Sequence, residues 1–412
     1  MRSRLRIVVS GMIAADPHQG GAVWAVLQYV LGLRDLGHDV FLIEPIASKA
    51  VRPPGAALAD SINARYFRDV AARFQLTGRA ALVRQDPRET VGLEYRSLLE
   101  VAARSDLLVN ISGMLADPAL LERIPRRVYL DLDPAFNQLW HAVQGIDIRL
   151  AGHTHFATVG SLIGTPACHI PTCGRQWLPT WQPIVLSEWP AMPPRPYAAW
   201  TTVGNWRGYG SIAYDGVMYG QKAHSFRRFM DLPQRTRELL RPALSIHPGE
   251  TTDLDALRAG GWDLVDAAAV AGTPDRYRGF IQESKGELGI AKSGYVESRC
   301  GWFSDRSVCY LASGRPVVAQ DTGFSRRLPT GDGLFAFNTL GEAAAALEAA
   351  SVDYVRHCRR ARQVADAFFR SDFVLSTLLE RVGATDETRT RPPSMDSDRT
   401  VGPAAASRGS AR

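Results

Sequence analysis

Lysine is scarce in this sequence, and long apolar runs are lacking. Only four of its 48 basic residues are lysines, and the 44 arginines are scattered among 42 acidic residues without forming a basic block. The net charge of +6 alone therefore does not indicate a nucleic-acid partner. No stretch approaches the ~20 apolar residues of a membrane span, and the run after the basic N-terminus covers only Ile7 to Val9. We therefore expect a cytoplasmic protein without a signal peptide or transmembrane segment, for which peripheral membrane contact is possible.

Several motifs of other protein classes are also missing. The five cysteines are an odd number, are widely spaced and form no Cys-x-x-Cys pair, which disfavours a disulfide framework or structural zinc. No Gly-x-x-x-x-Gly-Lys-Ser/Thr, Gly-x-Gly-x-x-Gly or Gly-x-Ser-x-Gly motif is found where a P-loop nucleotidase, a dehydrogenase or an α/β-hydrolase would need it. What remains is a globular chain of 412 residues, long enough for two domains.

Strand and helix patterns alternate along the first half of the chain. Residues 5–9 predict a buried strand, residues 10–21 a glycine-containing loop, residues 22–36 a helix and residues 39–44 a second strand. The pattern recurs with a strand at 106–110, a short helix at 118–123 and a strand at 127–131. This order predicts a doubly wound parallel sheet.

Proline and tryptophan mark a division in the chain. Five of the nine tryptophans lie in residues 177–206, together with six prolines, which predicts an extended linker whose aromatic side chains pack on neighbouring surfaces. A second α/β unit begins at residue 200. Its predicted strands are 200–204, 244–246, 263–265, 288–291 and 316–319, and its predicted helices are 223–230, 253–259, 275–284, 304–313, 341–350 and 352–382.

The expected organisation is α/β, with two doubly wound, Rossmann-like domains that face a cleft. We expect an N-terminal domain at 1–176, a linker at 177–199, a second domain at 200–350, a terminal helix at 351–383 that packs back across both, and a disordered tail at 384–412. Both sheets should direct the carboxyl ends of their strands at the cleft, where such folds bind ligands.

The residues from Ser304 to Gly323 carry the strongest local signal for a ligand. Ser304 is a suitable N-cap for a helix that contains Asp305, Arg306 and Ser307, and Asp321-Thr322-Gly323 follows the next predicted strand. A helix start with hydroxyls and an arginine suits a diphosphate. The alternative is a capped helix and a turn, with Arg306 in solvent.

Other polar residues lie on loops that are expected at the cleft. His18 and Asp16 share the first glycine loop and are candidates for a catalytic base and its partner, or are two solvated loop residues. Asp131 and Asp133 follow a strand and could bind an acceptor or a divalent ion, or form a turn into Pro134. His153 and His155 have a metal-like spacing without an evident third ligand, or belong to the acceptor site or the core. Tyr295 and Trp302 are candidates for stacking on a base, or are core residues.

The segment Ala312-Ser-Gly-Arg-Pro-Val-Val-Ala319 resembles the "A-x-G-x-P-V-V-A" signature of group 1 glycosyltransferases with the GT-B fold. Gly20-Gly21 and Leu36-Gly-His-Asp-Val40 resemble the glycine loop and the "L-x-x-x-G-H-x-V" element of the same family. The segment at residues 337–342 also resembles the family. So does the C-terminal helical segment, which contains Ala361, Arg362, Ala365 and Phe368. The resemblance extends over residues 1–383.

The resemblance implies transfer of a sugar from a nucleotide-sugar donor, bound by the C-terminal domain, to an acceptor held by the N-terminal domain. The sugar would go to a small molecule or a cell-envelope or polysaccharide acceptor, without an obligatory cofactor or metal. The family holds the donor diphosphate with a basic pair, which here implies Asn205 and Arg207 together with Lys222, separated by an insertion. The alternative for Lys222 is a surface lysine at the start of a helix. Glu287 and Lys292 lie where the family approaches the nucleobase or the sugar, or pair with each other.

One departure from the family pattern concerns its two conserved glutamates. The positions of the Glu-x7-Glu motif are occupied by Gly301 and Cys309. Ser304, Ser307 or Asp321 could replace these carboxylates in a divergent subfamily, or transfer could be lost. Whether the reaction inverts or retains stereochemistry is therefore left open. The alternatives are a non-catalytic sugar-nucleotide-binding protein, and a nucleotide-sugar epimerase or phosphorylase of the same architecture.

Overall fold

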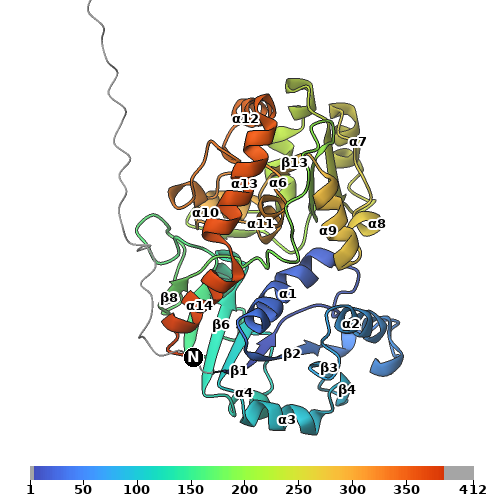
Figure 1. Ribbon diagram of the computed structural model, residues 1–412, viewed down its shortest axis with the longest axis vertical. Coiled ribbons are helices and arrows are strands. Elements are labelled where there is room, and N and C mark those ends of the chain that lie inside the picture. Colours follow the sequence, from blue (N-terminus) through green and yellow to red (C-terminus); the bar gives the residue numbers. More distant parts are fainter. Residues whose placement is uncertain (1–3, 385–412) are drawn as a thin grey trace, which may run out of the picture.

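The computed structural model describes residues 4–384 and contains two lobes, each built on a parallel sheet (Figure 1). In the first lobe, eight strands follow the order β4-β3-β2-β1-β5-β6-β7-β8, and every neighbouring pair is parallel except β3 and β4. The strands are β1 (Arg6–Ser10), β2 (Asp39–Ile46), β3 (Ala80–Arg84), β4 (Glu89–Gly92), β5 (Leu107–Ile111), β6 (Arg126–Asp131), β7 (His155–Thr158) and β8 (Trp177–Pro179). The helices of this lobe are α1 (Gly20–Asp35), α2 (Ile62–Arg73), α3 (Tyr95–Ala103), α4 (Pro118–Leu121) and α5 (Phe136–Gln144).

The second lobe has a five-stranded parallel sheet in the order β12-β9-β13-β14-β15. Its strands are β9 (Trp200–Asn205), β12 (Leu240–Ser245), β13 (Gly286–Gly289), β14 (Val317–Gln320) and β15 (Leu334–Phe337). Its helices are α6 (Lys222–Phe226), α7 (Thr251–Gly260), α8 (Ala267–Ala271), α9 (Pro274–Glu283), α10 (Ser293–Ser298), α11 (Asp305–Ala312), α12 (Leu340–Val352) and α13 (Tyr354–Phe368), followed by α14 (Ser371–Arg381). Short 3-10 turns cover Ser48–Ala50, Leu58–Asp60, Arg227–Phe229, Leu232–Arg235 and Phe324–Arg326.

Strand alternation places apolar side chains on both faces of the first sheet. Ile7 and Val9 of β1 belong to a core that includes Leu27 of α1. Val8, between them, faces the opposite side, where it packs in a cluster with Leu98 of α3. Successive side chains of a strand point to opposite faces, so a sheet covered by helices on both sides needs an unbroken apolar strand. Residues 7–9 meet that requirement.

The linker residues contact both lobes, as their composition predicts. Trp189 is fully buried and packs edge-on against Trp24 of α1 and Tyr277 of α9. Trp181 packs against Phe369, which lies just after α13. The aromatic side chains of the linker thus fill the space where the lobes meet.

The linker predicted at 177–199 begins too early, because Trp177–Pro179 is strand β8 of the first sheet. Two predicted elements are also wrong. Residues 263–265 form no strand of their own, because only Val265 bridges to Ala243 of β12. The single helix predicted over 352–382 is two helices, which break at Phe369 and Arg370. There the backbone turns to exchange hydrogen bonds with Ile184 of the linker: Ile184 donates to the Phe369 carbonyl at 2.7 Å, and Ser371 donates to the Ile184 carbonyl at 2.9 Å.

The last two helices connect the lobes. α13 packs against α11 of the second lobe and α14 against α1 of the first, and in Figure 1 they run from the upper lobe to the lower one. The predicted disordered tail lies outside the described residues except for Ala384. Within residues 4–384, no helix has both the length and the apolar character needed to cross a membrane.

Candidate functional site

The carboxyl ends of β13 and β14 and the start of α11 enclose a pocket in the second lobe. Ser304 caps α11, because its hydroxyl accepts the backbone N–H of Arg306 at 3.2 Å. Parallel strands direct their carboxyl ends to one edge of the sheet, and the free N–H groups of a helix start favour an anion there. The pocket is lined by Gly289, Ala291, Trp302, Phe303, Ser304, Arg306, Ser307, Ala319, Gln320, Thr322 and Phe324.

Arg306 points into the protein rather than into solvent. Its Nε lies 2.5 Å from a carboxylate oxygen of Glu287, and its Nη1 donates to the Val203 carbonyl at 2.9 Å. Burial alone would lower the pKa of Arg306, but Glu287 raises it above its usual value. Glu287 is completely buried, and its second oxygen has no hydrogen-bond partner. The solvated alternative for Arg306 is therefore wrong.

Lys222 is the second buried cation at this edge. Its ammonium group donates to the Ile290 carbonyl, just beyond β13. Burial lowers the pKa of Lys222 well below its usual value, and the nearby charges of Arg306 and Lys292 lower it further. Gly204 makes room for this lysine, because a Cβ at residue 204 would lie 2.9 Å from its Cε. When Lys222 is protonated, it and Arg306 bring two positive charges against the one carboxylate of Glu287, so an anionic ligand would favour the charged form of this lysine.

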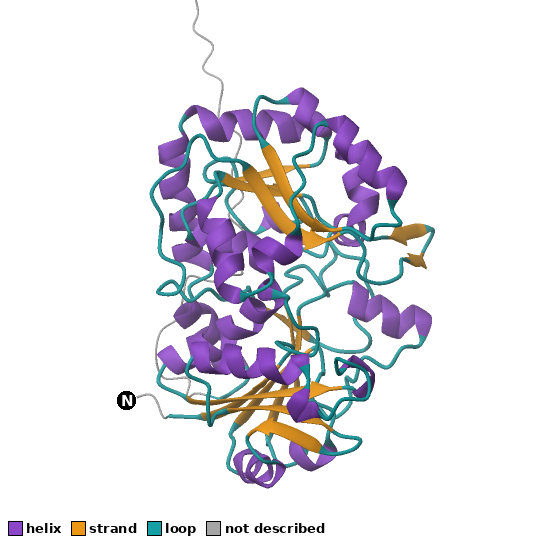
Figure 2. Cartoon of the chain, turned by 90° about the vertical axis from the view of Figure 1, so that its right-hand side faces the viewer, coloured by secondary structure: helices purple, strands orange, loops and turns teal. Residues whose placement is uncertain are grey.

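The basic pair implied by the family resemblance is not assembled. Asn205 and Arg207 are exposed, and Arg207 forms an ion pair with Glu250 instead of joining Lys222. The expected insertion is present as a hairpin of β10 (Ile212–Tyr214) and β11 (Val217–Tyr219), which projects from the side of the second lobe (Figure 2). The guanidinium beside Lys222 belongs to Arg306.

Lys292 belongs to a cluster that joins the two lobes. Its ammonium nitrogen is 3.5 Å from a carboxylate oxygen of Asp133, which follows β6 of the first lobe. Tyr209 donates its hydroxyl to the same carboxylate at 2.7 Å, and Tyr295 donates to it as well. Burial, and then Asp133, raise the pKa of both tyrosines well above the usual value. The alternative pairing of Lys292 with Glu287 is wrong.

Tyr209 belongs to this cluster but was not predicted, because no local sequence pattern indicates its role. Tyr295 and Trp302, which were candidates for base stacking, stack on each other with ring centroids 4.0 Å apart. Tyr295 is thereby buried, while Trp302 also lines the pocket.

The loop after β14 is held by its own hydrogen bonds. The Asp321 carboxylate accepts the backbone N–H of Gly323 at 2.9 Å and the hydroxyl of Ser325 at 2.6 Å. Thr322 donates its hydroxyl to the Trp302 carbonyl. Of this loop, Thr322 lines the pocket, whereas the Asp321 carboxylate is engaged within its own loop. Asp305, at the start of α11, has a raised pKa because it is buried.

Gly20 and Gly21 allow α1 to approach the second lobe closely. A Cβ on Gly20 would strike the Thr273 carbonyl, and one on Gly21 would lie 3.0 Å from the Tyr277 ring. This geometry gives both glycines a packing role between the lobes. His18, in the preceding loop, has a left-handed backbone (φ 67°) and packs edge-on against Tyr66 at 5.1 Å.

Asp16 and His18 are both exposed. Among the hydrogen bonds of the described residues there is none between Asp16 and His18, so the structure places the two side chains in one loop without coupling them.

Sequence reasoning missed the carboxylate that shapes the first loop. Glu44 of β2 is fully buried and accepts the backbone N–H groups of Ile13 at 3.0 Å, Ala14 at 2.8 Å and Ala15 at 2.6 Å. Burial raises the pKa of Glu44 to about 7, against the lowering effect of these hydrogen bonds. Glu44 thus fixes the start of the loop that carries Asp16 and His18.

The other candidate metal ligands have structural partners. Asp131 is buried and accepts hydrogen bonds from Asn137 at 2.6 Å and Thr158 at 2.8 Å. His153 lies 3.0 Å from the Asn110 amide, and His155 contacts Thr154. Within residues 4–384, no group of three or more His, Cys, Asp or Glu residues is placed to hold a metal ion.

The structure explains why the glutamates of the family motif are missing. Gly301 has φ 74°, and a Cβ there would strike the Ser161 hydroxyl of the first lobe. Its carbonyl accepts that hydroxyl at 3.0 Å. Cys309 lies inside the core on α11, where burial raises its pKa well above the usual value. Neither position can accept a glutamate that reaches the pocket without a rearrangement.

Solved structures resemble the whole chain. HepE from Anabaena, in complex with UDP and glucose, is 10% identical, with a TM-score of 0.56; the match covers 92% of this chain and 100% of that one. An alpha-glucosyltransferase in complex with UDP-glucose and DNA containing an abasic site gives the same values. HepE in complex with UDP-glucose is 9% identical, with a TM-score of 0.57 over the same shares.

No protein-family model matches the sequence, and no curated protein matches it either. The likeness is therefore one of architecture, in which two mainly parallel sheets form two lobes. The chain has the GT-B fold of these glycosyltransferases.

Proposed function

We propose that this chain is a cytoplasmic, hexosyltransferase-like glycosyltransferase that uses a nucleotide-sugar donor. The observation that carries the proposal is the buried pair of Lys222 and Arg306 beside the start of α11, opposed by the single carboxylate of Glu287. A nucleoside diphosphate would supply the missing negative charge. As the leaving group of sugar transfer, it would be stabilised by the same two cations.

The proposed donor is a uridine diphosphate sugar. HepE and the alpha-glucosyltransferase, which share the fold, are in complex with UDP or UDP-glucose. The acceptor would enter from the first lobe, and we propose a small molecule or a cell-envelope or polysaccharide precursor. His18 remains the proposed base, with Asp16 in the same exposed loop. Because Gly301 and Cys309 supply no carboxylate, transfer would rest on positioning and on stabilisation of the leaving diphosphate.

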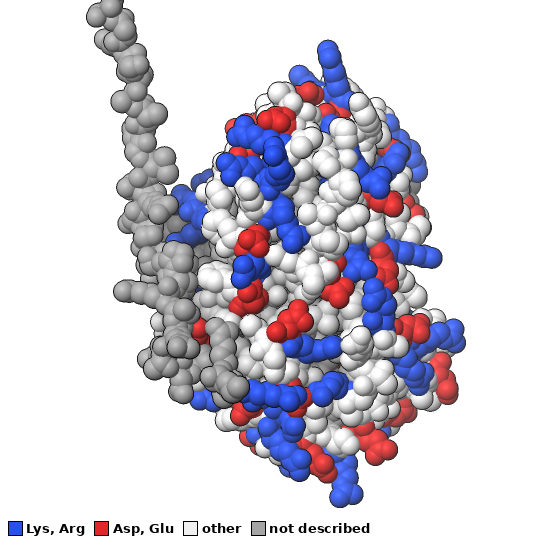
Figure 3. All heavy atoms as spheres, viewed as in Figure 1, with Lys and Arg blue, Asp and Glu red and all other residues white. Residues whose placement is uncertain are grey.

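The exclusion of nucleic acid as a partner stays a prediction. Basic and acidic side chains are intermixed over the face seen in Figure 3, which does not favour binding of a polyanion. However, one of the solved structures of the same fold holds DNA. An electrophoretic mobility assay with duplex DNA at low and moderate salt tests this prediction, and a retained, salt-sensitive complex would contradict it.

The donor site is tested by replacing Lys222 with Met. Removing a buried charge should raise the melting temperature of the ligand-free protein, while the affinity for UDP should fall by about tenfold or more. Thermal shift and calorimetry with UDP, UDP-glucose and the other nucleoside diphosphates measure both effects. Arg207→Gln is the matched control, since Arg207 is exposed and paired with Glu250.

The Arg207 control should bind UDP as the unmodified chain does. Unchanged UDP affinity in both Lys222→Met and Arg306→Gln would contradict the donor site. The second candidate function is a non-catalytic binding protein, because both glutamates of the family motif are absent. Binding of UDP-glucose without hydrolysis or transfer of glucose would favour this second candidate. A product that carries an altered sugar still attached to UDP would indicate an epimerase.

A further inference from the structure

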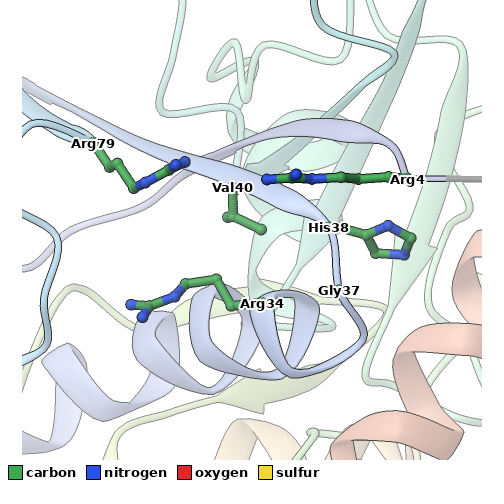
Figure 4. Close-up of a pocket in the computed structure, with 6 residues that line it drawn as sticks. All are labelled: Arg4, Arg34, Gly37, His38, Val40 and Arg79. Carbon is green, nitrogen blue, oxygen red and sulfur yellow. The ribbon is translucent and has the colours of Figure 1, made fainter.

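A group of arginines lies at the amino ends of the first-lobe strands, on the edge opposite to the donor pocket. Arg4 precedes β1, Arg34 lies in the last turn of α1 and Arg79 precedes β3. Figure 4 shows these three side chains around one hollow, with the Arg4 and Arg79 guanidinium groups directed toward each other across Val40. Arg6 of β1 forms an ion pair with Asp39, as Arg4 and Arg79 do. We call Arg4, Arg6, Arg34 and Arg79 the arginine cluster.

The arginine cluster has more positive charge than its partners neutralise. Asp39 is the common partner of three members: Arg6 at 2.8 Å, Arg4 at 3.8 Å and Arg79 in direct contact. Arg34 donates to the Phe74 carbonyl at 2.8 Å. Three guanidinium groups therefore share the one carboxylate of Asp39, while the charge of Arg34 acts on the neighbouring carboxylate of Asp35. The four arginines thus exceed the carboxylates of Asp39 and Asp35 by two positive charges, and the neighbouring Arg104 and Asp106 add one charge of each sign.

The cluster borders open space on two sides. One hollow of about 360 Å³ is lined by Arg4, Arg34, Gly37, His38, Val40 and Arg79. A second hollow of about 530 Å³ shares Arg4 and Arg79 with the first. The Arg4 side chain is 69% exposed and that of Arg79 is 42% exposed, so their N–H donors are accessible from both hollows. A Cβ on Gly37 would meet no atom within 4 Å, which leaves the floor of the first hollow open.

We propose that the arginine cluster is a second anion site, which binds a ligand that carries two or more phosphate charges. Guanidinium groups pair with phosphate oxygens through two parallel N–H donors, and an excess of two positive charges matches a ligand with at least two negative charges. The phosphate belongs either to a free ligand or to the headgroups of a lipid surface. The site is independent of the proposed sugar transfer, because it lies at the other end of the first lobe.

The first test is calorimetric titration of the full chain with inorganic pyrophosphate. The double variant Arg4→Gln/Arg34→Gln removes two donors and leaves Asp39 paired with Arg6 and Arg79, so the fold should be preserved. The control is Arg96→Gln/Arg258→Gln, which removes two exposed arginines that pair within their own helices. We expect two sites in the unmodified chain and in the control. One of these sites should weaken by about tenfold or more in the double variant.

The variant Lys222→Met separates this proposal from the donor site. It should lose the donor site and keep the cluster site. If the donor proposal is wrong, the unmodified chain should bind a single pyrophosphate, at the arginine cluster. The double variant Arg4→Gln/Arg34→Gln should then weaken this binding. If Arg4→Gln/Arg34→Gln binds pyrophosphate as the unmodified chain does, the arginine cluster does not bind the phosphate of a free ligand.

The second test is sedimentation with phosphatidylcholine vesicles, with and without phosphatidylglycerol. Binding to the anionic vesicles that is lost in Arg4→Gln/Arg34→Gln, and kept in the control, assigns the phosphate to lipid headgroups. Pyrophosphate binding without vesicle binding assigns it to a free ligand. If the double variant changes neither measurement, the arginine cluster is not an anion site.

Discussion

At the scale of single residues, Glu44 combines complete burial with backbone N–H groups that favour its ionised form. Burial has the larger effect and raises its pKa to about 7, whereas a glutamate in the unfolded chain titrates near 4.3. Between these two values the folded protein binds more protons than the unfolded chain. The free energy of unfolding must therefore fall as the pH rises through this window.

We predict that this loss approaches about 3 kcal/mol between about pH 5 and about pH 8, and that Glu44→Gln removes most of it. The amide oxygen can still accept N–H groups from residues 13–15, so the loop should stay folded. Urea unfolding at a series of pH values measures the effect, with Glu122→Gln, an exposed position, as the control. If the free energy of unfolding depends on pH equally in the unmodified chain and in Glu44→Gln, the prediction is contradicted.

The residues of the donor site show what the sequence can and cannot specify. The N-cap at Ser304 and the strand that precedes Asp321 depend on neighbouring residues, and both were predicted. That Lys222 meets Arg306 rather than Arg207 depends on which strands are adjacent, because Arg306 reaches Val203 of β9 and Glu287 of β13. Such contacts between residues far apart in the chain leave no local pattern. The same holds for Tyr209 at Asp133 and for Glu44 under the first loop.

At the scale of secondary-structure elements, the contact between α1 and α14 depends on a glycine. A Cβ on Gly32 would lie 2.6 Å from Leu375 Cδ1 and 2.7 Å from the Ser371 Cβ. We predict that Gly32→Ala lowers the free energy of unfolding by about 1–3 kcal/mol, because α14 must move away from α1.

The same substitution at Gly341 is the matched control for Gly32→Ala. Gly341 lies in α12 with nothing within 4 Å of its potential Cβ, so Gly341→Ala should stabilise by about 0.4–1 kcal/mol through the unfolded state. Chemical denaturation of both variants measures the two effects. Stabilisation by both substitutions would show that the contact between α1 and α14 is loose.

The elements that could be predicted from apolar periodicity each bury a face. Other elements were not predicted, among them strands β3, β4, β7, β8 and β15 and helices α2, α3, α5, α8 and α10. The prediction failed where tertiary contacts override that pattern. The amphipathic pattern over 352–382 continues through Phe369 and Arg370, yet the backbone breaks there to bond with Ile184. Residues 263–265 lie beside the edge strand β12, where Asp263 pairs with Arg241 and only Val265 forms a bridge, to Ala243.

At the scale of the whole molecule, the cluster at Asp133 holds the two lobes together. Asp133 accepts the hydroxyls of Tyr209 and Tyr295 and pairs with Lys292, all from the second lobe. We predict that Asp133→Ala lowers the free energy of unfolding by at least about 1 kcal/mol and lets the lobes separate. Small-angle scattering should then show a larger radius of gyration.

The control for Asp133→Ala is Asp69→Ala, at an exposed position of α2, which should leave both the stability and the scattering unchanged. If Asp133→Ala scatters like the unmodified chain, the remaining contacts between the lobes, such as that of Ser161 with Gly301, are sufficient to keep them together.

The chain crosses between the lobes twice, once through the linker and once between α13 and α14, and Ile184 bonds the two crossings to each other on both sides. Two separate connections could shear or twist independently. Two connections that are hydrogen-bonded to each other should act as one hinge, which favours rotation of the lobes about a single axis. We therefore expect any relative movement of the lobes to be a rotation at this joint rather than an independent displacement of either connection.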